Sequence, residues 1–269
     1  MSDDSDEYLQ ANCAIWDAWT AHDLTSDHHQ AVEVVRAGGS TLRSIECDEL
    51  GEVAGRTLLH LQCNMGADTL SWARLGAVVT GVDFSHEAIS VAQQLANEIG
   101  LPARFITSDI YQLPGALNER FDLVVGTYGT IGFLPDLARW AEVVARFVAD
   151  GGRFLLVDIH PLSLILQQMA EADSNGDLAV ARSYFTDGAP DEESVKGGDA
   201  RSPLYTWRHS LGDVVTAFAQ AGLRIAALRE YSYTFWRQFP SLRQDSDGWW
   251  RCPDDTPQVP LLYSLLAVR

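Results

Sequence analysis

The sequence predicts an α/β protein built on a doubly wound, mostly parallel sheet. Short apolar runs rich in β-branched residues alternate with helical patterns from Leu58 to Ile159, and the connections between them are short. With 269 residues and 46% hydrophobic content, the chain can bury a full core. We therefore expect a single domain over residues 1–269, with a helical cap at 1–50, a core at 56–160, an inserted cover at 162–205 and completing elements at 206–269.

The segment Arg56–Asp83 organises the predicted sheet. Leu58, Leu59 and Leu61 are suited to a strand buried on both faces, and Gln62–Gly66 is a turn. A helix from Ala67 to Leu75 ends at Gly76, and the second strand delivers Asp83 to its carboxyl end. A unit of this kind places a nucleotide-like ligand at the helix N-terminus and an acid near a ribose.

The elements that follow continue the alternation of strand and helix. Ser85 and Gly100 are a suitable N-cap and stop for the first of these helices. The predicted elements are helix 86–99, strand 103–107, strand 121–125, helix 136–148, strand 153–159, helix 210–221 and strands 223–235 and 261–268. His160-Pro161 stops the fifth strand at its carboxyl end, and residues 237–260 form a long aromatic-rich loop.

Two segments outside this alternation are candidates to cover a ligand. Residues 8–19 predict a helix with Trp16 and Trp19 on one face, which either docks the helix on the core or forms a lid. His28 and His29 suit a solvated loop or helix start better than a metal site. Residues 163–172 predict a helix, and 174–202, rich in Gly, Asp, Glu and Ser, a flexible excursion on the ligand side.

Composition narrows the function. The net charge of −18 and the absence of a Lys/Arg cluster argue against a nucleic-acid partner. The four cysteines fit no zinc or redox template, and no metal-ligand cluster stands out. The acidic start MSDDSDE is unlike a signal peptide, and no apolar run approaches the ~20 residues of a membrane span. We expect a cytoplasmic protein without a membrane partner, and its oligomeric state stays open.

Five segments in order resemble the class I S-adenosylmethionine-dependent methyltransferases of the small-molecule type. They are LLHLQCNMGADTL, VTGVDFS, ARFITSDIYQLP, FDLVVGTYGTIGFLPDLARW and GGRFLLVDIHP. The resemblance covers residues 58–159 closely and the C-terminal strands in layout. It implies a seven-stranded sheet whose last strand inserts antiparallel, and S-adenosylmethionine as cofactor.

The resemblance also implies roles for individual residues. The turn that holds Gln62, Asn64 and Gly66 would pass beneath the methionine portion of the cofactor. Asp83 would accept hydrogen bonds from both ribose hydroxyls, and Phe84 would flank the adenine. Asp109 would accept a hydrogen bond from the adenine amino group, while the Ile110 backbone would face the adenine ring. Thr127 would border the sulfonium. The family turn is usually glycine-rich and follows an acid, whereas this chain has His60, Gln62 and Asn64 there.

Two other functions compete with methyl transfer. A nicotinamide-dependent oxidoreductase also uses a glycine-rich turn and an acid on its second strand. However, a pyrophosphate needs bare backbone N–H groups, and Gln62, Asn64 and Asp68 suit a zwitterionic amino acid better than two phosphates. A cofactor-binding protein without catalysis is the third possibility.

The acceptor chemistry rests on fewer residues. His160 is the candidate general base, and the alternative is that it orders the turn before Pro161. Tyr128 either steers the acceptor or packs on the cofactor. Trp16, Trp19 and Trp236 are candidate substrate contacts in an aromatic-lined cavity for a small, largely apolar molecule. Which molecule accepts the methyl group, and whether on oxygen, nitrogen, carbon or sulfur, stays open.

Overall fold

The computed structural model describes residues 3–22, 26–168, 178–197 and 200–269. Within them one seven-stranded sheet has the order β10-β14-β5-β4-β1-β2-β3. Its strands are β1 (Thr57–Leu61), β2 (Val78–Asp83), β3 (Ala103–Thr107), β4 (Phe121–Thr127), β5 (Val148–Ile159), β10 (Arg224–Tyr231) and β14 (Leu262–Val268). β1 to β5 are parallel, and β14 inserts antiparallel between β5 and β10. The predicted fold class is confirmed.

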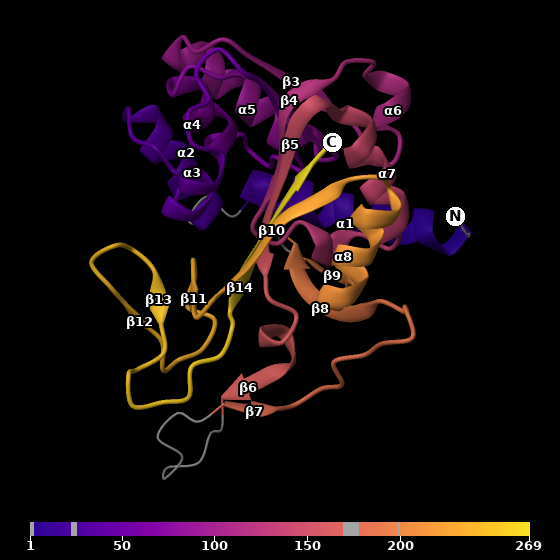
Figure 1. Cartoon of the computed structure of the whole chain (residues 1–269), viewed down its shortest axis with the longest axis vertical. Helices are drawn as coiled ribbons and strands as arrows, with labels where there is room; N and C mark the ends of the chain where they lie inside the picture. The colour runs from indigo at the N-terminus through magenta and orange to yellow at the C-terminus, as the bar shows by residue number, and fades with distance from the viewer. Residues whose placement is uncertain (1–2, 23–25, 169–177, 198–199) are drawn as a thin grey trace.

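Helices cover both faces of this sheet (Figure 1). One side carries α2 (Asp27–Arg36), α3 (Ser44–Leu50), α4 (Ala67–Arg74) and α5 (His86–Ile99). The other side carries α6 (Leu113–Ala116), α7 (Leu137–Phe147) and α8 (Leu211–Gln220). The α7 face that packs on the sheet contains Trp140, Val144 and Phe147, all fully buried, so the apolar stripe fixes which side of the helix faces inward.

The predicted helix ends are confirmed. The Ser85 hydroxyl accepts the Ala88 N–H at 3.0 Å and so caps α5. Gly76 and Gly100 follow their helices with φ of 88° and 67°, a conformation that costs glycine least. α1 (Asp3–His22) contains the helix predicted at 8–19, and His28 and His29 lie in the first turn of α2.

The cover segment differs from the prediction. The helix predicted at 163–172 is wrong over 163–168, where a 3-10 turn, η2 (Ser163–Ile165), leads into β6 (Leu166–Gln168); the rest of it lies outside the described residues. β6 pairs with β7 (Leu178–Val180), and β8 (Asp191–Gly197) pairs with β9 (Ala200–Thr206) as a hairpin. The predicted flexible excursion is therefore wrong in its described part, because cross-strand pairing orders it.

The long loop predicted at 237–260 also contains short strands. β13 (Trp250–Arg251) pairs on one side with β11 (Tyr233–Thr234) and on the other with β12 (Arg243–Gln244), which makes a small antiparallel sheet. This sheet and the β6–β7 pair extend beyond one end of the main sheet (Figure 1). Trp249, next to β13, is buried against the α3 side of the core, so the aromatic residues of this segment hold it on the domain.

Candidate active site

The turn after β1 is built from left-handed residues. Gln62, Asn64 and Gly66 have φ of 54°, 50° and 73°. The conformation costs a non-glycine residue roughly 1–2 kcal/mol, and it persists here because the Asn64 N–H donates to Asp83 at 2.8 Å while the Asn64 side chain accepts the Met65 N–H at 2.6 Å. The turn after β1 is thereby fixed to the end of β2.

Gly66 serves packing beneath this turn. A Cβ at this position would lie 2.8 Å from the Ala92 Cβ and from the Phe105 ring. The glycine therefore lets the turn sit closely on α5 and β3, and it does not by itself provide room for a ligand.

Asp83 ends β2 as a buried carboxylate, with 7% of its surface exposed. It accepts backbone N–H groups from Asn64 at 2.8 Å and from Ser85 at 2.9 Å. Burial raises its pKa to about 6 in spite of these bonds. A carboxylate has about four acceptor positions, so two remain for further donors.

The end of β3 lies beside Asp83. The Ser108 N–H donates to the Asp83 carbonyl at 2.8 Å, and the Asp109 carboxylate accepts the Tyr111 N–H at 2.8 Å. Burial raises the pKa of Asp109, and Ile110 is buried next to it. Phe84 follows Asp83, and its carbonyl accepts the Cys13 thiol of α1 at 3.5 Å. The structure thus brings Asp83, Phe84, Asp109 and Ile110 to one edge of the sheet, as predicted.

His60, in the place of the usual acid, ties the turn to β4. Its Nδ1 lies 2.8 Å from the Thr69 hydroxyl and its Nε2 lies 3.2 Å from the Thr127 hydroxyl. Burial lowers its pKa to about 4, so the imidazole is neutral at physiological pH. His60 therefore positions Thr127 at the end of β4.

Gln62 leaves one buried acceptor unsatisfied. Its Nε2 donates to the Thr130 carbonyl at 3.0 Å, whereas its buried Oε1 has no hydrogen-bond partner among the described residues. Such an atom costs roughly 1–3 kcal/mol when it is unpaired. The position fits an ammonium group, and a phosphate there would meet an acceptor oxygen. The residues present therefore fit an amino-acid cofactor better than a dinucleotide.

Sequence reasoning missed a second group of polar residues at this edge. Glu46 of α3 is 1% exposed and accepts the Tyr128 hydroxyl at 2.6 Å. The Arg43 guanidinium lies over the Trp249 ring at 5.2 Å and the Tyr128 ring at 6.0 Å. Asp68 starts α4 and accepts the Thr41 hydroxyl at 2.5 Å. Tertiary docking of α3 brings Arg43 and Glu46 to the site, and no local motif marks them.

His160 lies at the end of β5, where both of its ring nitrogens are engaged. Nδ1 accepts the Leu162 N–H at 3.0 Å. Nε2 lies 2.9 Å from a Glu230 carboxylate oxygen, an ion-pair distance without the alignment of a hydrogen bond. This geometry supports the turn-ordering alternative for His160.

Two of the three predicted substrate tryptophans come together. The Trp16 ring lies edge-to-face with Trp19 at 5.1 Å and with Phe133 at 5.5 Å. A cavity of about 240 Å³ opens beside them. It is lined by Trp16, Trp19, Thr20, Ser26, His28, Asn64 and Met65. Trp236 is 40% exposed, packs on Phe235, and does not line this cavity.

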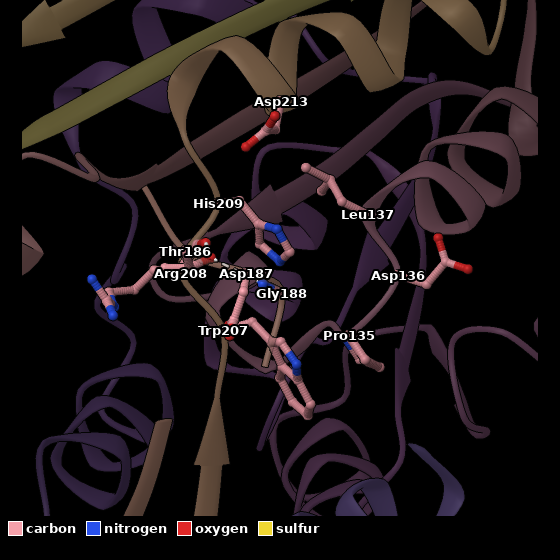
Figure 2. A pocket seen from close by; sticks show the side chains of 10 residues that line it. All are labelled: Pro135, Asp136, Leu137, Thr186, Asp187, Gly188, Trp207, Arg208, His209 and Asp213. Atoms are coloured by element: carbon pink, nitrogen blue, oxygen red, sulfur yellow. Dashed lines mark hydrogen bonds between the residues drawn. The ribbon is translucent and has the colours of Figure 1, made fainter. Parts of the chain in front are cut away.

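A larger cavity of about 520 Å³ lies beside the starts of α7 and α8 (Figure 2). Its acids already have structural roles, since Asp136 caps α7, Asp187 accepts the Ala189 N–H at 3.1 Å and Asp213 accepts the Ser210 hydroxyl. His209 Nε2 lies 2.8 Å from the Leu134 carbonyl. None of the predicted site residues lines this cavity, so it is separate from the edge formed by β1, β2 and β4.

Metal and membrane features are absent from the described part of the chain. No group of three or more His, Cys, Asp or Glu side chains there is placed to hold a metal ion. No described helix has the length and apolarity needed to cross a bilayer.

The sheet order and the strand-end residues define a Rossmann-like methyltransferase fold of class I. Residues 58–152 match the family model described as a methyltransferase domain. The chain therefore has the fold of the class I S-adenosylmethionine-dependent methyltransferases, and its residues 58–152 are similar to a methyltransferase domain.

Individual relatives agree with this class. A ubiquinone biosynthesis O-methyltransferase from Methylobacterium sp. (strain 4-46) is 36% identical over 115 residues, which are 42% of this chain and 45% of that relative. The chain thus spans less than half the length of the curated relative it matches. A methyltransferase structure from Mesorhizobium loti aligns with a TM-score of 0.56 and 18% identity over 81% of this chain and 93% of that one. A second methyltransferase structure, from Clostridium acetobutylicum, aligns with a TM-score of 0.55 and 14% identity over 90% of this chain and 92% of that one.

Proposed function

We propose that this protein transfers a methyl group from S-adenosylmethionine to a small-molecule acceptor. The observation that carries the proposal is the pair of acceptors left open at one sheet edge. They are the unpaired Gln62 Oε1 and the Asp83 carboxylate with its two remaining positions. An ammonium group and a ribose diol are complementary to them in charge and hydrogen-bonding sense.

The residues at this edge would hold the cofactor from end to end. Asp109 and Ile110 would face the adenine, Asp83 the ribose, and Gln62 the amino group. The carboxylate of the methionine portion would lie at the start of α4. Burial raises the pKa of Asp68 there, and the nearby charge of Arg43 opposes this rise. When bound, the cofactor supplies an activated methyl carbon, so the protein's task is to orient the acceptor and exclude water.

The acceptor would be small and largely apolar. The cavity beside Trp16 and Trp19 reaches Asn64 and Met65 of the turn, so an acceptor bound there would lie next to the cofactor. α1 closes this side, since Asp17 accepts the Ser85 hydroxyl at 2.5 Å. The named relative is a ubiquinone biosynthesis O-methyltransferase, which agrees with oxygen as the acceptor atom.

Replacing the ribose acid tests this proposal. We expect Asp83→Ala to weaken S-adenosylhomocysteine binding by roughly 1–3 kcal/mol, because it removes charge-assisted hydrogen bonds. Titration calorimetry measures the change, and Glu193→Gln, an exposed acid on β8, is the control for net charge. An unchanged dissociation constant for Asp83→Ala would remove Asp83 as the ribose acid.

A further inference from the structure

Tyr128 and Glu46 form a short, buried hydrogen bond at the end of β4. Tyr128 follows Thr127 and adopts φ of 53°, a left-handed conformation that is rare for an aromatic residue. Its hydroxyl donates to Glu46 Oε2 at 2.6 Å. The Phe235 ring packs on it with a centroid distance of 4.7 Å. Strained backbone of this kind concentrates where a side chain must point in one particular direction.

Glu46 is a buried carboxyl without an ion-pair partner among the described residues. Its second oxygen accepts the Arg43 backbone N–H at 2.7 Å. Four ionisable groups face it: Arg43 and Cys47 from its own segment, Asp68 from α4, and Tyr128 from the end of β4. Arg153 of β5 reaches the end of α3, but its guanidinium donates to the Glu49 and Leu50 carbonyls.

Burial, together with a neighbouring carboxylate, favours the neutral form of Glu46. Burial and the nearby Asp68 raise its pKa to about 7, against the opposing effects of the Tyr128 and Arg43 hydrogen bonds. A carboxyl that ionises near neutral pH suits proton transfer, since the best catalytic pKa lies near the working pH.

The position of the pair relates it to methyl transfer. Thr127, one residue before Tyr128, is bonded to His60 beneath the turn after β1. Tyr128 therefore follows the strand end that borders the proposed methyl-transfer position. The acceptor would extend from the Trp16–Trp19 cavity, which Tyr128 does not line, to reach the Tyr128 hydroxyl. In His160, the other candidate base at this edge, Nδ1 accepts the Leu162 N–H and Nε2 lies 2.9 Å from a Glu230 carboxylate oxygen.

We propose that Tyr128 and Glu46 form a proton relay that deprotonates the methyl acceptor, an inference that rests on the proposed function. A lone pair of the acceptor atom forms the new bond to the methyl carbon. The bond between that carbon and sulfur breaks, and its electron pair stays on sulfur. The acceptor's proton passes to the Tyr128 oxygen as the hydroxyl proton of Tyr128 moves to the Glu46 carboxylate. Tyr128 is the catalytic residue, and Glu46 is a positioning residue that acts through it.

The relay defines the class of acceptor. It benefits an acceptor that has a proton to lose: a phenolic or aliphatic hydroxyl as it attacks, or an amine once it has been methylated to an ammonium. A thiol that ionises unaided, or a tertiary amine, gains nothing from it. The proposed substrate is thus a small, neutral, hydroxylated or amine-bearing molecule.

The first test needs neither acceptor nor cofactor. Infrared or carbon NMR titration of protein labelled at glutamate carboxyls should show one group that titrates near pH 7. Glu46→Gln should abolish this signal, and Glu49→Gln, on the same helix, should leave it in place. Tyr128→Phe should move it to higher pH, because the tyrosine hydrogen bond lowers the pKa of Glu46. If no such signal exists, or if it survives Glu46→Gln, the relay is wrong.

The second test is the pH profile of methyl transfer. The probe acceptors are catechol, benzyl alcohol, benzylamine and thiophenol, with release of S-adenosylhomocysteine as the readout. We expect kcat/KM for a hydroxyl or amine acceptor to rise through pH 7 in the native protein. Glu46→Gln should flatten this rise, and Tyr128→Phe should lower the rate by about 100-fold or more. Unchanged profiles, or transfer to thiophenol alone or to none of the four, would overturn the relay.

Calorimetry with S-adenosylhomocysteine separates this proposal from the function beneath it. If the native protein and both variants bind the compound but the profiles are unchanged, the relay fails and methyl transfer stands. If the native protein does not bind it, the proposed function fails first.

Discussion

Individual residues at the sheet edge show how far the sequence alone could locate the site. Asp83 and Asp109 end neighbouring parallel strands, and strand ends in a parallel sheet share one edge, so their proximity follows from the strand pattern. Arg43 and Glu46 could not be predicted, because they precede β1 and reach the site only when α3 docks on the core. The open Gln62 oxygen likewise depends on the Thr130 carbonyl from a distant segment.

Gln62 can be tested by a substitution that suits its backbone. Gln62→Gly relieves the left-handed strain but also loses the bond to Thr130, so we expect thermal stability to change by less than roughly 1 kcal/mol. Cofactor affinity should fall by about tenfold, because the ammonium loses its acceptor. Equal affinities of the Gln62→Gly and native proteins would contradict the role of Gln62.

The pKa of Asp83 predicts a pH dependence of cofactor binding. The carboxylate must be ionised to accept two hydroxyl donors, and its pKa in the folded protein is about 6. Because this value is raised, ionisation of Asp83 costs folding stability as pH rises from about 4 to 6, whereas cofactor binding improves over the upper part of that range. Calorimetry between pH 5 and 8 should therefore show weaker binding below pH 6. An affinity that stays constant over this range would contradict the prediction.

At the scale of elements, α1 and the β8–β9 hairpin form one cover. The Asn12 side chain bonds both the N–H and the carbonyl of Tyr205, at 2.8 and 2.7 Å, and Trp19 Nε1 donates to the Lys196 carbonyl at 2.8 Å. The hairpin sequence is polar and lacks an apolar alternation, so the sequence predicted flexibility; its order comes from pairing with α1, more than 170 residues away. Helices with clear caps, such as α5, could be predicted from their own sequence without knowledge of a distant partner.

Asn12→Ala tests this coupling. The substitution removes the partner of two part-buried backbone groups of Tyr205, and we expect it to cost roughly 1–3 kcal/mol in the stability of the cover. Hydrogen exchange should accelerate in α1 and in β8–β9 together, while β1 and β4 stay protected. Gln10→Ala, an exposed position on the same helix, serves as control. Faster exchange in α1 alone would show that the two elements open independently.

At the scale of the whole molecule, the fold was the most predictable feature. The local signals, which are the strand and helix patterns and the helix caps, all favour the same overall fold. The doubly wound sheet can therefore be predicted from the sequence. The insertions after β5 and after β10 were the least predictable. Their short strands pair only with one another, and the β8–β9 hairpin also packs on α1. In these segments the sequence pattern carries least information.

The central claim is that the edge formed by β1, β2 and β4 binds a sulfonium amino-acid cofactor and not a dinucleotide. Titration calorimetry of the native protein with S-adenosylhomocysteine and, separately, with NADH at pH 7.5 tests it most directly. The predicted result is saturable one-to-one binding of S-adenosylhomocysteine, weakened by Asp83→Ala, and no binding of NADH. Binding of NADH with none of S-adenosylhomocysteine would contradict the account.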